Sequence, residues 1–235
     1  MIVYGRNAVR EALRGPRAVH RIWATKNAAR EEWLREARVP VVVADSAEIL
    51  RRSASEGHQG ICAEVADFRY AAAEELLALD APLLVALDQV QDPQNLGAIC
   101  RTAECAGAAG LILPERRAAE VTPAVCKASA GAVEHLPVAQ VRNLADLIAQ
   151  AKRAGVWCYG AHADGPLDYR QVDFSGPVML VLGSEGRGLR PRVASLCDGL
   201  VSLPLRGRIE SLSVAAAAAV LLYAAAAPRT EHDRA

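Results

Sequence analysis

Aromatic side chains are scarce in this sequence of 235 residues: Phe, Trp and Tyr make up 4% of it, whereas hydrophobic residues of all kinds make up 52%. The chain is long and apolar enough for a substantial core, which must therefore be built from aliphatic side chains and alanine. Lysine is also rare, with 3 lysines against 24 arginines. Because the formal net charge is zero, the composition neither requires nor excludes a nucleic-acid partner.

Long apolar runs and targeting signals are missing as well. The longest apolar run, Val214 to Ala227, has 14 residues and is rich in alanine, so it is too short to cross a bilayer. No charged-then-apolar leader precedes Tyr4, and we therefore expect no secretory signal. These features predict a cytoplasmic protein that does not enter a membrane.

Patterns of metal ligands are absent from the cysteines. They include no C-x-x-C pair, and no histidine stands at the spacing of a zinc site. We therefore expect free thiols and no bound metal. The six cysteines are Cys62, Cys100, Cys105, Cys126, Cys158 and Cys197.

Helix and strand patterns alternate along the chain and predict an α/β fold in two domains. Residues 1–66 are expected to form a small α/β domain with a mild excess of cations, eleven Lys and Arg against eight Asp and Glu. Residues 67–80 are expected to form an acidic linker. In residues 81–227, strands separated by helices predict a parallel sheet with helices on both faces, and residues 228–235 are expected to be a tail.

A glycine-rich loop follows a buried strand late in the chain. The strand at residues 178–182 leads into the loop at 183–188, and a second strand, 200–205, precedes an alanine-rich helix that begins near Ser211. Ligands of parallel sheets bind beyond the carboxyl ends of the strands, and glycine allows close approach of the backbone. The spacing G-x-x-G-x-G differs from the dinucleotide-binding fingerprint. The residues alone leave a plain strand-to-helix turn as the alternative to a ligand site.

The first strand-to-helix junction of the larger domain carries two further candidates. Asn95 is expected at the start of a helix, where asparagine is most often a cap. Arg101 follows within a helix that is otherwise apolar at Leu96, Ile99 and Cys100. Burial of this arginine would require an anionic or hydrogen-bonding partner.

Three motifs follow one another in the larger domain: D-P-Q-N-L-G-A-I-x-R-T-A from Asp92, G-S-E-G-R-G-L from Gly183 and L-P-L-x-G-x-x-x-S-L-x-V from Leu203. In this order they resemble the motifs of the SpoU (TrmH) family of RNA 2′-O-ribose methyltransferases. The resemblance covers residues 83–227. It implies a SPOUT-type parallel sheet with a C-terminal trefoil knot, S-adenosyl-L-methionine as the cofactor, and a homodimer formed through the knot region.

The small domain carries a second resemblance, in Y-G-R-N-A-V-R-E-A-L from Tyr4 and G-H-Q-G-I from Gly57. These segments are similar to the ribosomal-protein-like substrate-binding domain of ribosomal RNA guanosine methyltransferases of the RlmB type. The similarity implies that the substrate is a guanosine ribose in 23S ribosomal RNA. It also implies RNA contacts at Arg6, His58 and Gln59, for which plain surface loop positions are the alternative.

The resemblance also implies which residues hold the cofactor and act in catalysis. The catalytic set is Arg101, Asn95, Glu185 and Ser211. The cofactor is expected to contact the backbone at Gly183, Leu203 and Leu212, with Leu182, Ser184, Gly186 and Pro204 shaping the pocket.

Arg101 is given the central role by this resemblance, either as the base or as a fixed cation. Lowering the pKa of an arginine to near neutrality would cost about 7 kcal/mol, and arginine stays protonated in proteins. We therefore interpret Arg101 as a cation that fixes a phosphate and stabilises the developing alkoxide. Asn95 and Glu185 are expected to orient Arg101 or the ribose, and Ser211 to bond the acceptor or the motif loops.

One position departs from the family pattern. The family commonly has S-L-N-V-S where this chain has Ser211, Leu212, Ser213, Val214 and Ala215. Serine is shorter than asparagine and lacks its second polar group, so a contact made by that asparagine is weakened or bridged by water here. A non-catalytic RNA-binding or ribosome-assembly factor therefore stays open, as does transfer RNA as an alternative substrate.

Overall fold

The computed structural model describes residues 1–232 and divides into two compact units. Unit 1 comprises residues 1–69 together with 120–135, and unit 2 comprises residues 70–119 and the chain from 136 onward. The sequence predicted two continuous domains, whereas residues 120–135 leave the larger domain and pack with the small one. Residues 233–235 of the predicted tail lie outside the described residues.

Unit 1 is a four-stranded sheet with short helices. Its strands lie in the order β1-β4-β2-β3, with β4 antiparallel to both of its neighbours and β3 parallel to β2. Its elements are β1 (Ile2–Tyr4), α1 (Arg6–Arg14), β2 (Val19–Ala24), α2 (Glu32–Arg35), β3 (Val41–Val43), α3 (Ser46–Ser53), β4 (Ile61–Val65) and α6 (Pro123–Ala128), with single 3-10 turns at Ala28–Arg30, Glu56–His58 and Ala132–Glu134.

A buried ion pair fastens the segment 120–135 within unit 1. Arg17 donates from Nε to Glu134 Oε2 at 2.7 Å and also pairs with Oε1, and the two side chains are 7% and 0% exposed. The guanidinium also donates to the carbonyl of Ala66 and lies over the ring of Phe68. Burial opposes the charge of Arg17, but the hydrogen bond and the charge of Glu134 outweigh it and raise the pKa of Arg17.

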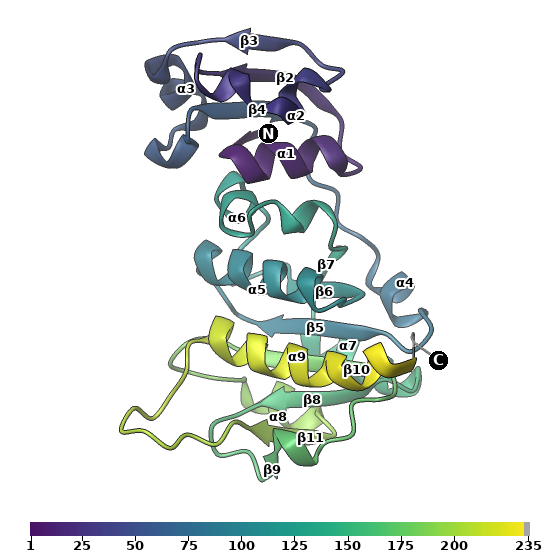
Figure 1. Cartoon of the computed structure of the whole chain (residues 1–235). Helices are drawn as coiled ribbons and strands as arrows, with labels where there is room; N and C mark the ends of the chain where they lie inside the picture. Colours follow the sequence, from purple (N-terminus) through teal and green to yellow (C-terminus); the bar gives the residue numbers. More distant parts are fainter. Residues whose placement is uncertain (233–235) are drawn as a thin grey trace. The chain divides into compact units, whose positions relative to one another are not determined.

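Unit 2 contains a seven-stranded sheet in the order β7-β6-β5-β10-β8-β11-β9, and every neighbouring pair is parallel. The α/β fold with a parallel sheet is therefore confirmed (Figure 1). Its elements are α4 (Ala73–Leu77), β5 (Leu83–Asp88), α5 (Pro93–Cys105), β6 (Gly110–Pro114), β7 (Val138–Val141), α7 (Leu144–Arg153), β8 (Trp157–Ala161), β9 (Leu167–Asp168), β10 (Val178–Gly183), α8 (Pro191–Leu196), β11 (Gly199–Ser202) and α9 (Val214–His232), with a 3-10 turn at Tyr169–Gln171.

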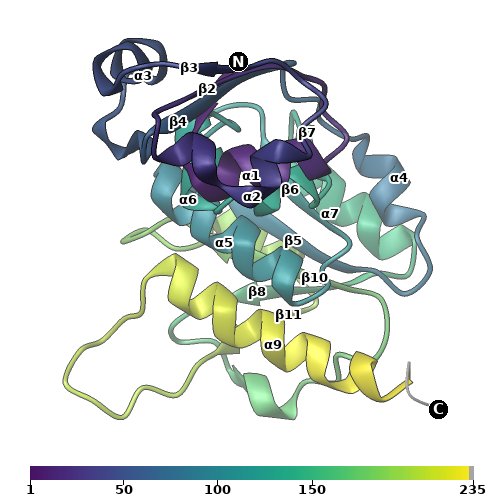
Figure 2. The ribbon, with the colours of Figure 1, turned by 45° about the horizontal axis from the view of Figure 1, so that its top comes forward.

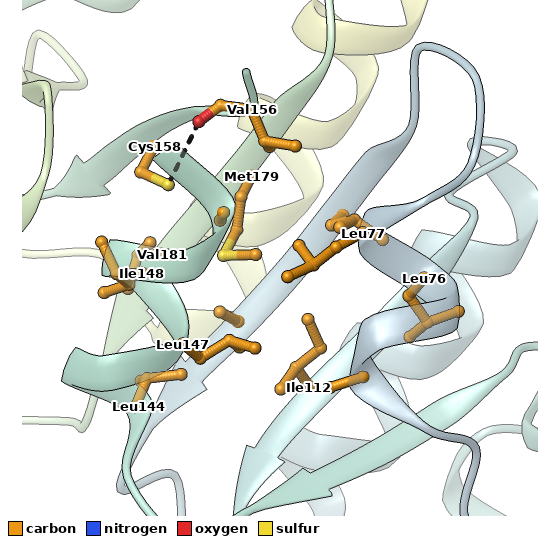
Figure 3. Packing of buried hydrophobic residues seen from close by; sticks show 14 of the residues in the cluster. Leu76, Leu77, Ile112, Leu144, Leu147, Ile148, Val156, Cys158, Met179 and Val181 are labelled. Carbon is orange, nitrogen blue, oxygen red and sulfur yellow. Dashed lines mark hydrogen bonds between the residues drawn. The ribbon is translucent and has the colours of Figure 1, made fainter. Parts of the chain in front are cut away.

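Helices cover both faces of this sheet because its central strands are apolar except for Asp88, the last residue of β5. Every residue of β5 and β10 is buried. Alternate residues such as Leu84 and Met179 join one cluster with α4, α7 and α8 (Figure 3). On the other side of the sheet, α9 packs against both β10 and α5.

The C-terminal helix begins and ends later than the sequence predicted. It starts at Val214 rather than near Ser211, and it continues to His232 with Pro228 inside it. Figures 1 and 2 show α9 lying beside α5, and the segment from β11 to α9 extending as an open loop.

Two short strands, β1 and β9, were not predicted, because three and two residues are too few to show an alternation. Residues 28–35 form a 3-10 turn followed by the four-residue α2. The trefoil knot stays a prediction. Within residues 1–232, each helix is too short or too polar to span a membrane.

Candidate active site

A cavity of about 590 Å³ opens at the carboxyl edge of the sheet of unit 2. Three neighbouring segments form it: the ends of β8, β10 and β11 with their following loops, closed by the start of α9. Its lining residues are Ala161, His162, Ala163, Leu182, Gly183, Ser184, Glu185, Gly186, Gly188, Val201, Leu203, Leu205, Glu210, Ser211, Leu212, Ser213, Val214 and Ala217. The predicted strand ends and helix start thus do meet around one space.

The glycine loop after β10 is a closed turn with no room for side chains at its base. Ser184 and Gly188 exchange two backbone hydrogen bonds of 3.1 and 2.9 Å. A Cβ atom at Gly183 would lie 2.0 Å from the carbonyl carbon of Gly188. Gly186 and Gly188 have φ values of 75° and 65°, which glycine adopts without strain. The glycines therefore shape this wall of the cavity.

A buried carboxylate at the end of β5 fixes the far end of the same loop. Asp88, which is 1% exposed, accepts from the Arg190 backbone N–H at 2.9 Å and from Arg190 Nε at 2.7 Å. Two contacts from one arginine hold both its backbone and its side chain. The loop between β10 and α8 is thereby tied at both ends.

Asn95 and Glu185 are brought together from two different motifs. Asn95 is the third residue of α5, whose cap is Asp92 rather than Asn95. Its side-chain nitrogen donates to Glu185 Oε1 at 2.8 Å. Because Asn95 is free of a capping role, its amide can hold the carboxylate that lines the cavity.

Arg101 stands apart from this pair in the described chain. It lies six residues beyond Asn95 on α5, which places it about 9 Å along the helix axis and on a different face. Leu96, Ile99 and Cys100 are buried whereas Arg101 is exposed, so the condition that a buried arginine needs a partner does not apply within this chain. Within the described residues, the Arg101 side chain makes no hydrogen bond and no ion pair.

Ser211 and Ser213 have different surroundings. Ser211 lines the cavity and lies three residues before α9, so it does not cap that helix. Ser213, the residue that departs from the family pattern, caps it instead: its hydroxyl oxygen accepts from the backbone N–H of Ala216 at 3.2 Å. Asparagine caps helices equally well, so the departure retains this local function.

Six of the seven predicted cofactor positions line the cavity, and Pro204 lies between two lining residues without lining it. His162 was not predicted. Its Nδ1 atom accepts from the backbone N–H of Asp164 at 3.1 Å, which fixes the ring at the end of β8. His162 could have been predicted as a cavity residue if β8 had been known to lie next to β10. The order of the strands in the sheet cannot be read from the sequence. Residues 1–232 offer no group of three or more metal-ligating side chains.

The predicted RNA contacts of unit 1 divide into two kinds. Arg6 and Gln59 are exposed and adjacent, since the Arg6 backbone N–H donates to Gln59 Oε1 at 3.1 Å. Arg6 also pairs with Glu31 at 2.8 Å. His58 is buried, and its Nδ1 accepts from the backbone N–H of Gly60 at 2.9 Å. His58 therefore stabilises the turn that presents Gln59.

The parallel sheet and its edge cavity define an α/β protein built to bind a small molecule beyond its strand ends. Two family models match the chain: the SpoU rRNA Methylase family over residues 82–223, and RNA 2′-O ribose methyltransferase substrate binding over residues 2–71. The chain therefore belongs to the SpoU rRNA methylase family.

Similar proteins span nearly the whole chain. "Putative TrmH family tRNA/rRNA methyltransferase YacO" of Bacillus subtilis is 37% identical over 235 residues, covering 94% of this chain and 93% of that protein. The SpoU methyltransferase AviRb of Streptomyces viridochromogenes, crystallised in complex with AdoMet, superposes with a TM-score of 0.83 at 26% identity, covering 98% and 90% of the two chains. An AdoMet-bound rRNA methyltransferase of Sinorhizobium meliloti gives a TM-score of 0.79 at 29% identity, covering 95% and 85%.

Proposed function

We propose that this protein transfers a methyl group from S-adenosyl-L-methionine to the 2′-hydroxyl of a guanosine ribose in large-subunit ribosomal RNA. The observation that supports this most directly is the hydrogen bond between Asn95 and Glu185 at the rim of the edge cavity. It joins the first and second motifs of the family beside the third, which supplies Ser211.

The cavity suits the proposed cofactor in size, wall and charge. Its volume of about 590 Å³ lies within the usual range for small-molecule sites. Leu182, Leu203 and Val201 supply apolar surface, and the glycine turn leaves backbone groups accessible. Glu185 and Glu210 are the charged lining residues, and two carboxylates complement a ligand of net positive charge. When bound, S-adenosyl-L-methionine supplies an activated methyl group on a sulfonium.

The residues of the chain have to position a weak nucleophile and stabilise the charge that develops on it. Asn95 holds Glu185, which orients either the ribose or the arginine. Arg101 is proposed to fix the phosphate next to the ribose and to stabilise the developing alkoxide, because a guanidinium does so without losing its own proton. Proximity and alignment of this kind can supply on the order of 7 to 11 kcal/mol of the barrier.

We further propose that the protein is a homodimer through α9 and the loop before it. The exposed side of α9 carries an apolar stripe with a helical spacing, Ala216, Val220, Tyr223 and Ala227, of which Val220 and Tyr223 are 40% and 56% exposed. A second copy would cover this stripe. It would also explain why Arg101, on the neighbouring helix α5, stands away from Asn95 and Glu185 of its own chain.

The proposal is tested by incubating the protein with labelled S-adenosyl-L-methionine and either unmodified ribosomal RNA or unmodified transfer RNA, and then mapping 2′-O-methyl groups. We expect a methylated guanosine in the large-subunit RNA. Modification of the transfer RNA alone would assign the alternative substrate. Failure to modify either RNA, together with retained RNA binding, would favour the non-catalytic RNA-binding factor and contradict the proposal.

A further inference from the structure

The carboxyl edge of the sheet in unit 2 has two chemically different halves. The cavity occupies the half formed by β10, β8 and β11. The other half is formed by β5, β6 and β7, which are neighbours in the sheet (Figure 1). The loops beyond it carry Arg116 and Arg117 after β6 and Arg142 after β7, and all three residues are exposed.

These three arginines lack anionic partners. Within the described residues, none of the three side chains makes an ion pair or a hydrogen bond. Exposed arginines elsewhere in the unit are of both kinds: Arg170 pairs with Asp168 and Arg192 with Asp146, whereas Arg101 and Arg153 make no ion pair within the described residues. The three arginines are therefore grouped by the edge of the sheet that they share. Glu115 lies in the same loop as Arg116 and Arg117 and pairs with neither.

The loop after β6 is held in place rather than free. The backbone N–H of Ala119 donates to the carbonyl of Val90 at 2.9 Å, and Gln91 Nε2 donates to the carbonyl of Arg117 at 3.4 Å. On its other side, the backbone N–H of Glu115 donates to the carbonyl of Val141 at 2.9 Å. The backbone that carries Arg116 and Arg117 is thereby fixed between the loop that leads to Asn95 and the end of β7.

The two tied loops also contain strained backbone. Gln89 and Arg117 have φ values of 64° and 60°, in the left-handed region that side-chain-bearing residues seldom adopt. Such strain persists where the surrounding structure enforces it, and it clusters at ligand-binding sites. An arginine in a position that would suit glycine points to a requirement for its side chain.

We infer that Arg116, Arg117 and Arg142 form a track for the phosphodiester backbone of the RNA substrate, which leads along the β7-β6-β5 edge to the Asn95–Glu185 pair. This inference rests on the proposed function and adds to it the path of the RNA over the catalytic unit. Arginine suits phosphate because its planar donors match two oxygens at once. Phosphate contacts fix the register of a nucleic acid without reading its sequence, so the track positions the ribose and leaves the choice of base to other contacts.

The test compares wild-type protein with the variant Arg116→Gln/Arg117→Gln/Arg142→Gln. Binding of an unmodified large-subunit ribosomal RNA transcript is measured over a series of salt concentrations, and methyl transfer is measured in parallel. Each lost phosphate contact reduces the slope of log affinity against log salt by about 0.7 to 0.9. We therefore expect the slope to fall by about 2 to 3, the KM for RNA to rise on the order of tenfold or more, and the affinity for S-adenosyl-L-methionine to stay unchanged.

Arg153→Gln is the matched control. Arg153 is exposed, makes no ion pair within the described residues, and ends α7, the helix that leads to the amino end of β8, so it lies at the opposite edge of the sheet. It should leave the salt slope and KM as in the wild type. The pair Arg117→Gly and Arg117→Gln separates the effect of the backbone from that of the side chain. Arg117→Gly relieves the left-handed strain, so its thermal stability should hold or rise. RNA binding should fall equally in both variants, because both lack the guanidinium.

A triple variant with the salt slope and KM of Arg153→Gln would overturn the track, even if the wild type methylates RNA. The opposite result, a wild type that binds RNA with a slope reduced in the variant yet transfers no methyl group, would overturn the proposed function and leave the track standing. A wild type that does not bind the RNA at all would overturn both.

Discussion

Arg101 projects from the exposed side of α5 and is not part of the packing of its own chain. Arg101→Ala should therefore change the free energy of unfolding by less than about 0.5 kcal/mol. If the guanidinium stabilises charge at the acceptor oxygen, kcat should fall about 100- to 1000-fold, while calorimetry shows an unchanged affinity for S-adenosyl-L-methionine. Loss of cofactor binding in this variant would show that Arg101 serves the cofactor rather than the RNA acceptor.

Substitution of Gly183 is expected to weaken cofactor binding, which substitution of Arg101 leaves unchanged. In Gly183→Ala the added methyl group would meet the backbone of Gly188, which cannot move without opening the turn. Cofactor affinity should therefore fall at least tenfold, before any change at the RNA site, as measured by calorimetry. Gly176→Ala is the matched control, because a Cβ atom there has open space around it. Equal cofactor affinity in the two variants would remove the turn from the binding site.

The residues of the site were predictable from the sequence to the extent that motifs mark them. Six of seven expected cofactor positions line one cavity. The partners of these residues were not predictable, because Asn95 and Glu185 are ninety positions apart and meet only through the pairing of β5 with β10. The buried tie between Asp88 and Arg190 escaped the sequence for the same reason.

At the scale of elements, the buried carboxylate of Glu134 is one of the contacts that hold the segment 120–135 within unit 1. In Glu134→Gln the guanidinium of Arg17 would remain buried without its counter-charge, which typically costs 3–5 kcal/mol. Urea unfolding should show this loss. Glu48→Gln is the control, because Glu48 pairs with Arg51 and Arg52 of its own helix α3, which are 71% and 38% exposed, and it should cost about 1 kcal/mol or less. Similar losses in both variants would contradict a special role for the buried pair.

Element types were easier to predict than element limits. The central strands of the large sheet contain the apolar runs 83–87 and 178–182, and this pattern identified β5 and β10. The start of α9 was misplaced because two serines, Ser211 and Ser213, were both suitable caps, and only the observed bond to Ala216 distinguishes them. The small domain's mixed strand directions could not be read from alternation alone.

At the scale of the whole molecule, buried thiols lower the free energy of unfolding as the pH rises into the alkaline range. Burial raises the thiol pKa from an ordinary value of 9.0 to about 11 in Cys62 and Cys126, and to about 12 in Cys158 and Cys197. The unfolded chain ionises first, so stability is complete below pH 9 and is lost as pH rises from about 9 to about 12. We expect the urea midpoint to fall between pH 8 and pH 10.5.

Cys158→Ala/Cys197→Ala isolates the contribution of the thiols, because other groups also titrate in this range. The variant should be less stable than the wild type at pH 8, but its midpoint should change less between pH 8 and pH 10.5. Parallel curves for the two proteins would show that these thiols do not cause the alkaline loss.

The proposed homodimer makes a prediction about mixed dimers. If Arg101 serves the cavity of the partner copy, Arg101→Ala and Gly183→Ala chains, each inactive alone, should form one intact site per mixed dimer. Random exchange gives half mixed dimers, so about a quarter of wild-type activity should return. No recovery, with exchange verified by differently tagged chains, would place Arg101 in the site of its own chain.

Because residues 120–135 belong to unit 1, unit 1 is built from two separate stretches of the chain, which affects domain engineering and the evolution of the family. The amino-terminal piece of unit 1, if grafted onto a relative by a single cut near position 70, would arrive without Glu134, and Arg17 would then depend on the recipient for a counter-charge. A working graft needs three joints, at 69/70, 119/120 and 135/136. Recombination within this family should therefore favour exchanges that keep both pieces from the same parent.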